Sequence, residues 1–573
     1  MQSREQVAGA SLERSRTIAS VSRESLGAVI VAGSILRGHL LTALHVLSSV
    51  GALALAAPEP VRVMPNNVLV FVIDDVGVDM IGAYDAYFQS LGRAPGQPAS
   101  TPVIDQLLAA RGLTFASAWA CPTCTPSRAQ LLTGRHGFRT GIGVNLTDFE
   151  PVPSSNPGLS LDAVLLPELL KSALPFTCAA AGKWHLADLD QLATDLRHPL
   201  GNPPGRWFDV YAGSLFNLSR PTPPNLALSP YNDWMKAYAS ELVPGLDPCG
   251  SGTVPCVVAM SGPGPFEYAT ANTAEDAITL VSTLPEPWFV YVGFNACHAP
   301  VNYPIPAGMP TPTCPQTPPL AGPCQGVNEA EQTRCVMRTL DEQIGRVLCA
   351  VNESDTTVVL IGDNGSVADA ILPPFDPSHA KGSLYEGGVN VPLIVRSPDL
   401  VPQQVGYVSN ALVSNVDLFA TIAELGGIPP ALVQAEDSVS MVPYLHGQRR
   451  SIRSTVYSES FLPNFTPDPL TGAPPAGYFC TRHFQAVRTK RFKLIRRWNR
   501  DHNNPTTILV REEFYDLLRG GPPDMGTVPP TPTADPYEQN DLLQSGIAPG
   551  SVAERALLGL RQVLDTDYPT LVQ

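Results

Sequence analysis

Asn67-Val-Leu-Val-Phe-Val-Ile73 is an unbroken apolar run that leads directly into Asp74-Asp75. Continuous apolar, β-branched segments of this length are typical of strands buried in a parallel sheet. A second segment repeats the pattern, because Thr357-Val-Val-Leu-Ile-Gly362 runs into Asp363-Asn364. Ligands of open α/β sheets bind at the carboxyl ends of the strands, so both polar pairs are expected at a ligand-binding edge.

The two polar pairs together offer four hard oxygen donors. Adjacent carboxylates in a dry site cannot both stay ionised unless a cation lies nearby. A solvated turn would explain one isolated Asp-Asp pair, but the second copy of the pattern argues against that alternative. Carboxylate and amide oxygens suit calcium or magnesium better than zinc, which favours histidine and thiolate. The sequence therefore predicts a site for such a cation, formed by Asp74, Asp75, Asp363 and Asn364.

Basic side chains and histidines accompany three further segments that are typical of buried strands, namely residues 176–181, 288–294 and 391–395. A lone histidine or lysine is usually a surface residue or a satisfied core residue. Each of these residues, however, lies beside a predicted strand, where the ligands of α/β sheets bind. The candidates selected in this way are Lys183, His185, His298 and Lys381.

Cys124-Thr-Pro-Ser-Arg128, followed by Leu131-Leu-Thr-Gly-Arg135, contains the pattern Cys-x-Pro-x-Arg. The pattern is short, and a buried cysteine is more often inert packing than a nucleophile. Combined with the ordered motifs above, however, it resembles the signature of the type I, formylglycine-dependent sulfatases of the alkaline-phosphatase superfamily, and the chain looks arylsulfatase-like. The resemblance covers roughly residues 65–425, with weaker similarity to about residue 520.

The resemblance implies a modified nucleophile. In that family a formylglycine-generating enzyme oxidises the motif cysteine, here Cys124, to formylglycine. The aldehyde hydrate offers two geminal hydroxyls, one to attack sulfur and one to collapse and expel sulfate. The residues that the resemblance assigns to one calcium ion are Asp74, Asp75, Asp363 and Asn364, with an oxygen of the modified Cys124 completing the shell.

The resemblance also assigns roles to the basic residues. Arg128 and Lys183 would hold the hydrate and the sulfate. Lys381 and His298 would stabilise and protonate the leaving oxygen, and His185 would take the proton of the second hydroxyl. The implied reaction is cleavage of a sulfate monoester, on a small molecule or a sulfated sugar, to alcohol and sulfate.

Two alternatives remain open at this point. Phosphonate monoester and phosphodiester hydrolases of the same superfamily share the expected fold, and some also use formylglycine. A catalytically inactive binding protein on the same scaffold is the second alternative, although all the expected site residues are present. Residues 201–270 and 301–335 are expected to form the pocket for the alcohol portion of the substrate.

The expected fold is α/β, with a large, mostly parallel mixed sheet flanked by helices in a catalytic domain at residues 65–450. A small C-terminal α+β subdomain, residues 451–573, is expected to carry an antiparallel sheet. Its predicted elements are strands near 454–458, 484–488, 492–496 and 513–516, and a helix near 552–564.

Composition limits the partners and the compartment. The 573 residues carry a net charge of −15, so the composition does not indicate a basic surface for binding nucleic acid. The same negative charge offers little long-range attraction for an anionic sulfate, so local lysines and arginines must bind it. Residues 1–57 read as a leader whose apolar segment 40–57 is either a cleaved export signal or a membrane anchor. Export fits the cysteine content, and disulfides are expected between Cys249 and Cys256 and between Cys314 and Cys324, with buried thiols as the alternative.

Overall fold

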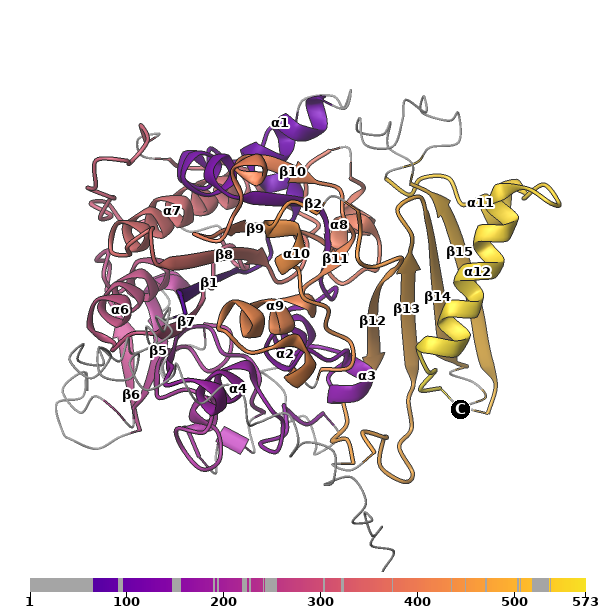
Figure 1. Ribbon diagram of the computed structural model, residues 1–573, viewed down its shortest axis with the longest axis horizontal. Helices are drawn as coiled ribbons and strands as arrows, with labels where there is room; N and C mark the ends of the chain where they lie inside the picture. Colours follow the sequence, from indigo (N-terminus) through magenta and orange to yellow (C-terminus); the bar gives the residue numbers. More distant parts are fainter. Residues whose placement is uncertain are drawn as a thin grey trace, which may run out of the picture. The chain divides into compact units, whose positions relative to one another are not determined.

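Two β-sheets organise the chain, and both belong to one compact unit, residues 64–573 (Figure 1). The larger sheet has 11 strands and the smaller has four. The structure is a computed structural model, and it describes residues 65–90, 96–146, 156–188, 191–192, 195–218, 224–225, 228–240, 242, 255–301, 305–320, 324–373, 375–433, 435–448, 450–468, 471–501, 504, 506–517, 535 and 537–572. The predicted leader, residues 1–57, lies outside this range.

The large sheet is mixed, as predicted, with the strand order β10-β2-β9-β8-β1-β7-β3-β4-β5-β6 and with β11 beside β2. Its central strands β8, β1, β7 and β3 are parallel, whereas β9, β5 and β6 pair with their neighbours in antiparallel fashion. The strands are β1 (Asn67–Ile73), β2 (Leu113–Trp119), β3 (Thr177–Gly182), β4 (Val210–Gly213), β5 (Asp233–Ser240), β6 (Cys256–Ser261), β7 (Trp288–Gly293), β8 (Thr356–Gly362), β9 (Asn390–Arg396), β10 (Tyr407–Ser409) and β11 (Val413–Ser414).

Helices cover both faces of this sheet, which is why β1 is apolar at every position. Leu69, Phe71 and Ile73 pack with residues of α1, α6 and α7 on one face. Val68 and Val70 pack with residues of α2, α4 and α9 on the other face. The α-helices within the described residues are α1 (Gly82–Ser90), α2 (Cys124–Thr133), α3 (Gly137–Thr140), α4 (Leu166–Ala173), α6 (Ala269–Thr283), α7 (Glu329–Cys349), α8 (Glu386–Val389), α9 (Asp417–Leu425), α10 (Val442–Leu445), α11 (Leu542–Ser545) and α12 (Val552–Asp567).

The small sheet is antiparallel and consists of β12 (Val456–Leu462), β13 (Arg482–Arg488), β14 (Phe492–Arg500) and β15 (Ile508–Asp516). Helix α12 lies along it, with Leu557 and Leu560 in the same apolar cluster as Phe514 (Figure 1). The opposite face contributes to a cluster that contains Trp119 of the large sheet, so the two sheets share buried side chains.

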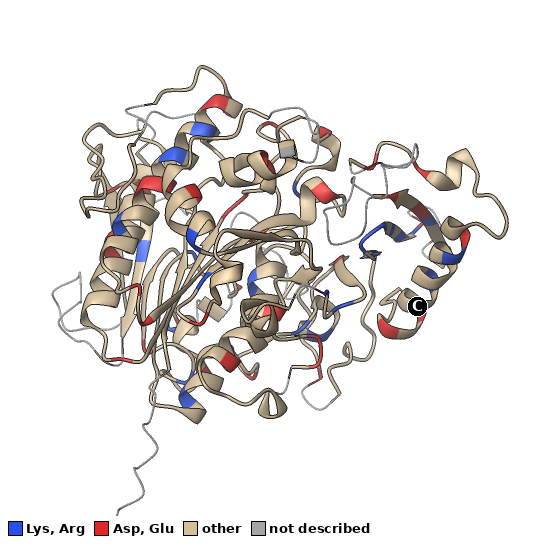
Figure 2. Cartoon of the chain, turned by 45° about the horizontal axis from the view of Figure 1, so that its top comes forward, with Lys and Arg blue, Asp and Glu red and all other residues tan. Residues whose placement is uncertain are grey.

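Arg496 and Arg497 do not form a basic patch. Consecutive strand residues point to opposite faces, and Arg496 pairs with Glu512 at 2.7 Å whereas Arg497 pairs with Glu513. Basic and acidic residues of the C-terminal strands and α12 lie close together (Figure 2).

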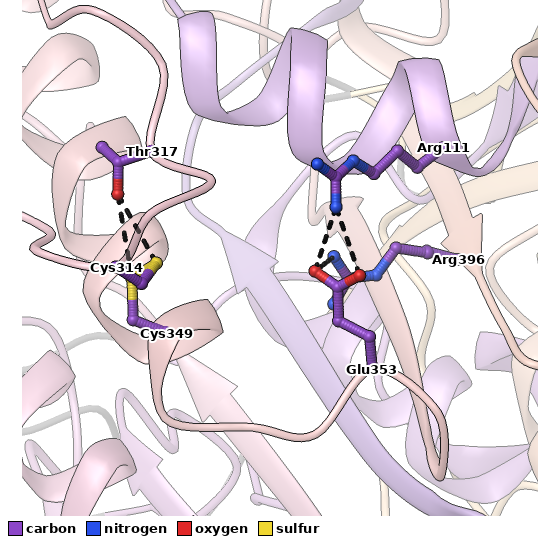
Figure 3. Close-up of a disulfide and its surroundings, with 6 residues drawn as sticks. All are labelled: Arg111, Cys314, Thr317, Cys349, Glu353 and Arg396. Atoms are coloured by element: carbon purple, nitrogen blue, oxygen red, sulfur yellow. Dashed lines mark hydrogen bonds and ion pairs between the residues drawn. A yellow bond between two sulfur atoms is a disulfide. The ribbon is translucent and has the colours of Figure 1, made fainter.

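Two disulfides fasten the segment before α7 to that helix, Cys314–Cys349 and Cys324–Cys335. The predicted Cys314–Cys324 pair is therefore wrong, because α7 presents a closer partner to each of these cysteines. Cys249 lies outside the described residues, and so does the predicted pair that includes it. Beyond α7, Glu353 binds both Arg111 and Arg396, each at 3.2 Å (Figure 3).

Within the described part of the chain, no helix combines the length and the apolar character needed to cross a membrane.

Candidate active site

The two polar pairs found in the sequence meet at the carboxyl ends of adjacent parallel strands. Ile73 of β1 lies opposite Gly362 of β8, so the residues that follow them emerge side by side. All four side chains are buried. Ligand atoms of Asp74, Asp75, Asp363 and Cys124 lie within 4.8 Å of one another. The predicted cation site is thus assembled together with the predicted nucleophile.

Cys124 is the first residue of α2, and its side chain points into this acidic cluster. Its Sγ lies 3.4 Å from Asp74 Oδ1 and 3.9 Å from Asp75 Oδ1. Burial, together with the negative charges of Asp363 and Asp74, raises the pKa of the Cys124 thiol. The thiolate is the nucleophilic form of cysteine, so these surroundings disfavour attack by an unmodified Cys124.

Three cations balance the three carboxylates. Lys183 follows β3, and its Nζ forms an ion pair with Asp74. Lys381 Nζ lies 2.5 Å from Asp75 Oδ1 and 3.4 Å from Cys124 Sγ. Arg128, one turn along α2 from Cys124, donates to Asp363 Oδ2 from Nε and Nη2. The sequence motifs therefore converge on one cluster in which three basic side chains pair with three carboxylates.

These cations control the ionisation of the cluster. Burial alone would raise the pKa of Asp74, but Lys183, His298, Arg128 and Lys381 hold that pKa well below its usual value. Burial and the neighbouring Asp74 charge raise the pKa of Asp363 instead. The two carboxylates share a dry site, so one ionises more readily than the other.

Two oxygen atoms of the cluster are suited to bind a metal. Among the described residues, Asp75 Oδ2 and Asn364 Oδ1 are buried without a hydrogen-bond partner. Asn364 Nδ2 donates to Asp75 Oδ1 and to Gly365 O, each at 2.9 Å, which leaves only the amide oxygen to act as a ligand. Buried polar atoms normally have a partner, and a hard divalent cation held by oxygen ligands would supply it here.

His185 is buried, two residues after Lys183 in the segment that follows β3. Its Nε2 is 2.9 Å from Leu146 O, and a carbonyl only accepts hydrogen bonds, so Nε2 carries the proton. Nδ1 is then an acceptor, and it has no partner among the described residues. Burial and the nearby Lys183 keep the pKa of His185 well below its usual value. The side chain is a neutral imidazole with one free basic nitrogen.

His298 lies on the more open side of the site. It is only partly buried, and one of its ring nitrogens lies within 4.8 Å of a ligand atom of Asp74 and of Cys124 Sγ. Tyr231 holds this segment in place, because its hydroxyl proton is shared between two carbonyl oxygens, Asn295 O at 3.0 Å and His298 O at 2.8 Å. His298 and Lys381 are therefore more exposed than Arg128, Lys183 and His185, which are all buried.

Two residues of the site were missed in the sequence. Arg128 Nη1 donates to Tyr291 OH at 3.2 Å, and Tyr291 lies in the predicted strand 288–294, where a buried hydroxyl needs a partner. Asn145 Nδ2 lies 4.0 Å from Cys124 Sγ. No pattern marks Asn145 in the sequence, because it lies in an irregular segment.

Gly293, the last residue of β7, lies against the backbone of Lys183 and the side chain of Arg128. A Cβ atom at this position would lie 2.5 Å from Lys183 O and 2.9 Å from Arg128 Nη1. No other residue type leaves room for this approach, so Gly293 at the end of β7 is part of the site's construction.

Comparisons with known proteins identify the family of the chain. The sequence model of the sulfatase family matches residues 66–428, more than half of the chain. N-acetylgalactosamine-6-sulfatase of Canis lupus familiaris is 28% identical over 434 residues, 72% of this chain and 71% of the relative. Arylsulfatase A of Bos taurus is 29% identical over 445 residues, 74% of this chain and 75% of the relative.

Solved structures share the fold. The PsFucS1 sulfatase from Pseudoalteromonas sp. aligns with a TM-score of 0.57 at 20% identity, over 87% of this chain and 90% of that chain. Ps i-CgsB in complex with k-i-k-neocarrahexaose has a TM-score of 0.57 at 20% identity, over 87% and 92% of the two chains. The chain belongs to the sulfatase family. It is accordingly a sulfatase, an enzyme that hydrolyses sulfate esters.

Proposed function

We propose that this sulfatase cleaves a sulfate monoester by means of a formylglycine formed from Cys124, with one calcium ion in the acidic cluster. The observation that carries the proposal is the position of Cys124 Sγ, 3.4 Å from both Asp74 Oδ1 and Lys381 Nζ. A reacting group on residue 124 lies between a metal-binding carboxylate and a cation. Maturation requires a formylglycine-generating enzyme as a partner.

Asp74, Asp75, Asp363 and Asn364 would hold the calcium ion, together with an oxygen of residue 124. Bound there, calcium supplies positive charge for the sulfate oxygens and favours ionisation of the attacking hydroxyl. The formylglycine hydrate supplies one hydroxyl for attack on sulfur and a second that allows sulfate to leave.

The basic residues complete the reaction. Arg128 and Lys183 fix the carboxylates that surround residue 124 and hold the hydrate and the sulfate. Lys381 and His298, on the open side, stabilise and protonate the leaving oxygen. His185 accepts the proton of the second hydroxyl at Nδ1, the nitrogen left free by the bond from Nε2 to Leu146 O.

A sulfated sugar is the substrate class that we favour. One relative is named as an N-acetylgalactosamine-6-sulfatase, and one structural neighbour is a complex with k-i-k-neocarrahexaose. We further propose that the protein is exported by its leader, residues 1–57, and that residues 65–450 and 451–573 act as catalytic domain and C-terminal subdomain.

The test is to assay purified enzyme on an aryl sulfate, sugar sulfates, choline sulfate, an aryl phosphate and a phosphodiester, with peptide mass spectrometry at residue 124. We expect an aldehyde at residue 124 and the fastest turnover on a sulfate. A sulfate monoester carries one negative charge, which one divalent ion with Arg128, Lys183 and Lys381 can match. Faster turnover of a phosphodiester or phosphonate would favour the phosphohydrolase alternative. Full activity with an unmodified Cys124 would overturn the formylglycine mechanism.

A further inference from the structure

We propose that Asn145 is an additional catalytic residue, whose Nδ2 donates a hydrogen bond to the reacting oxygens at residue 124 during sulfate transfer. This inference rests on the proposed function, because it needs an oxygen-bearing group and a sulfate at that position. It adds an uncharged donor to the charged neighbours of Cys124 Sγ, which are Asp74, Asp75 and Lys381.

The orientation of the Asn145 amide is fixed by its neighbours. Asn145 Oδ1 is 2.9 Å from Thr125 N, and a backbone N–H can only donate, so the atom facing it is the oxygen. Nδ2 therefore points to residue 124, where it lies 4.0 Å from Cys124 Sγ. That separation exceeds the usual 2.7–3.2 Å of an N–H···O bond. The hydrate would carry two oxygens on Cβ in place of Sγ, so the proposed acceptor is the second of these oxygens, or an oxygen of the attached sulfate, extending toward Nδ2.

The segment that carries Asn145 is held on both sides of the site. Leu146 N donates to Thr125 Oγ1 at 3.3 Å, and Leu146 O is the partner of His185 Nε2 at 2.9 Å. Asn156 Nδ2 donates to Asn145 O at 3.4 Å. The amide is thus positioned before any substrate arrives, the condition under which a donor stabilises charge that develops in a transition state.

Asn145 also lies on the accessible side of the nucleophile. Cys124, Lys183 and His185 are buried, whereas Asn145 is only partly buried, as are Lys381 and His298. The amide can therefore contact a bound sulfate. Being neutral, it donates a hydrogen bond without adding charge to the cluster.

The experiment compares Asn145→Asp with Asn145→Ala. The aspartate keeps an oxygen for Thr125 N but replaces the Nδ2 donor with an anionic acceptor, whereas alanine removes both groups. We expect kcat/KM on an aryl sulfate to fall about 10²- to 10³-fold in Asn145→Asp, at least as far as in Asn145→Ala, the scale of losing one oxyanion donor. The inhibition constant of inorganic sulfate should rise in parallel. All rates are divided by the formylglycine content of each preparation.

If the role of Asn145 is purely structural, the activities of the two variants should have the opposite order. If Asn145 only capped the start of α2, Asn145→Asp would remain active, because aspartate is an equally good cap with favourable charge, and only Asn145→Ala would be impaired. That result overturns the inference and leaves the proposed function intact. Asn328→Asp is the matched control, since Asn328 caps α7 by accepting from Glu331 N at 2.9 Å and should keep wild-type turnover. Wild-type enzyme that carries formylglycine but hydrolyses no sulfate would instead refute the proposed function.

Discussion

Arg128 places two N–H groups on a single oxygen of Asp363, with Nε–Oδ2 at 3.1 Å and Nη2–Oδ2 at 2.8 Å. Neither side chain has any exposed surface. The pair joins α2 to the segment that follows β8 and fixes the helix of Cys124 to the edge that carries the proposed calcium site. A fully buried charge pair is strongly destabilised when one partner is lost or misplaced.

Arg128→Lys should therefore be severely impaired although it keeps the charge. One ammonium cannot reproduce the planar set of donors that reaches Asp363, Lys183 O and Tyr291 OH. We expect kcat/KM on an aryl sulfate to fall about 10²-fold or more. Arg135→Lys, at an exposed pair with Glu436, is the control and should change activity little. Equal activity of the two variants would contradict this account of the pair.

Removal of a carboxylate from the proposed calcium site should weaken calcium binding and catalysis together. Asp74→Asn and Asp363→Asn each remove a negative charge from the cluster, and we expect a fall in rate of about 10²-fold or more. Calorimetric titration should show weaker calcium binding. Wild-type activity should be lost in chelator and return with calcium but not with zinc. Asp376→Asn, at an exposed helix cap, is the control. Activity that survives exhaustive chelation would exclude a calcium requirement.

Gly293→Ala should disturb the site without adding charge or polarity. The new methyl group would lie within contact distance of Lys183 O and Arg128 Nη1, so one of these groups must move. We expect kcat/KM to fall at least about tenfold, because small displacements of positioning groups are costly. Gly559→Ala in α12 meets no neighbouring atom and should raise stability by about 0.4–1 kcal/mol. A fully active Gly293→Ala enzyme would show that Lys183 and Arg128 can move to admit the methyl group without loss of function.

A buried charge network between α8 and the small sheet should make stability depend on pH. Lys493 Nζ lies 2.7 Å from Glu538 Oε1 and 3.3 Å from Glu386 Oε1. Burial, opposed by Lys493 and reinforced by Glu386, raises the pKa of Glu538 from 4.5 to about 7. The folded state then holds this proton more tightly than the unfolded state does. The stabilisation is complete below pH 4.5 and is lost as the pH rises through about 7.

The comparison that isolates this effect is wild type against Glu538→Gln. As the pH rises across that window, the Tm of the wild type should fall more steeply than the Tm of Glu538→Gln. The corresponding loss in the wild type's free energy of unfolding is at most about 1.4 kcal/mol per pH unit. Differential scanning calorimetry over a pH series measures it. Parallel curves for the two proteins would show that Glu538 does not titrate there.

The two disulfides that involve α7 should contribute unequally to stability. Cys314–Cys349 spans 35 residues and Cys324–Cys335 spans 11. The chain-entropy argument gives about 4 kcal/mol for the longer loop and about 3 kcal/mol for the shorter. The double variant Cys314→Ser/Cys349→Ser should therefore have a lower Tm than Cys324→Ser/Cys335→Ser. A wild-type Tm that does not change in strong reductant would contradict this prediction.

Local patterns in the chain predicted much of this architecture. The apolar run at 67–73 and its counterpart at 357–362 form buried parallel strands, because only a strand covered on both faces is apolar throughout. The polar residues after them were expected at a ligand-binding edge, and they meet there. The predicted C-terminal strands and helix are also present, with strand boundaries that differ by a few residues.

Other features depended on how distant segments pack. Cysteine spacing favoured Cys314–Cys324, but α7 brings Cys335 and Cys349 to these residues instead. The contacts of Asn145 and Tyr291 with the site, and the network around Lys493, join segments that no periodicity connects. Strand and helix patterns record which face of an element is buried, since burial follows the local repeat of the backbone. The partner of a buried polar or sulfur atom is set by the three-dimensional path of the chain, which a local pattern does not encode.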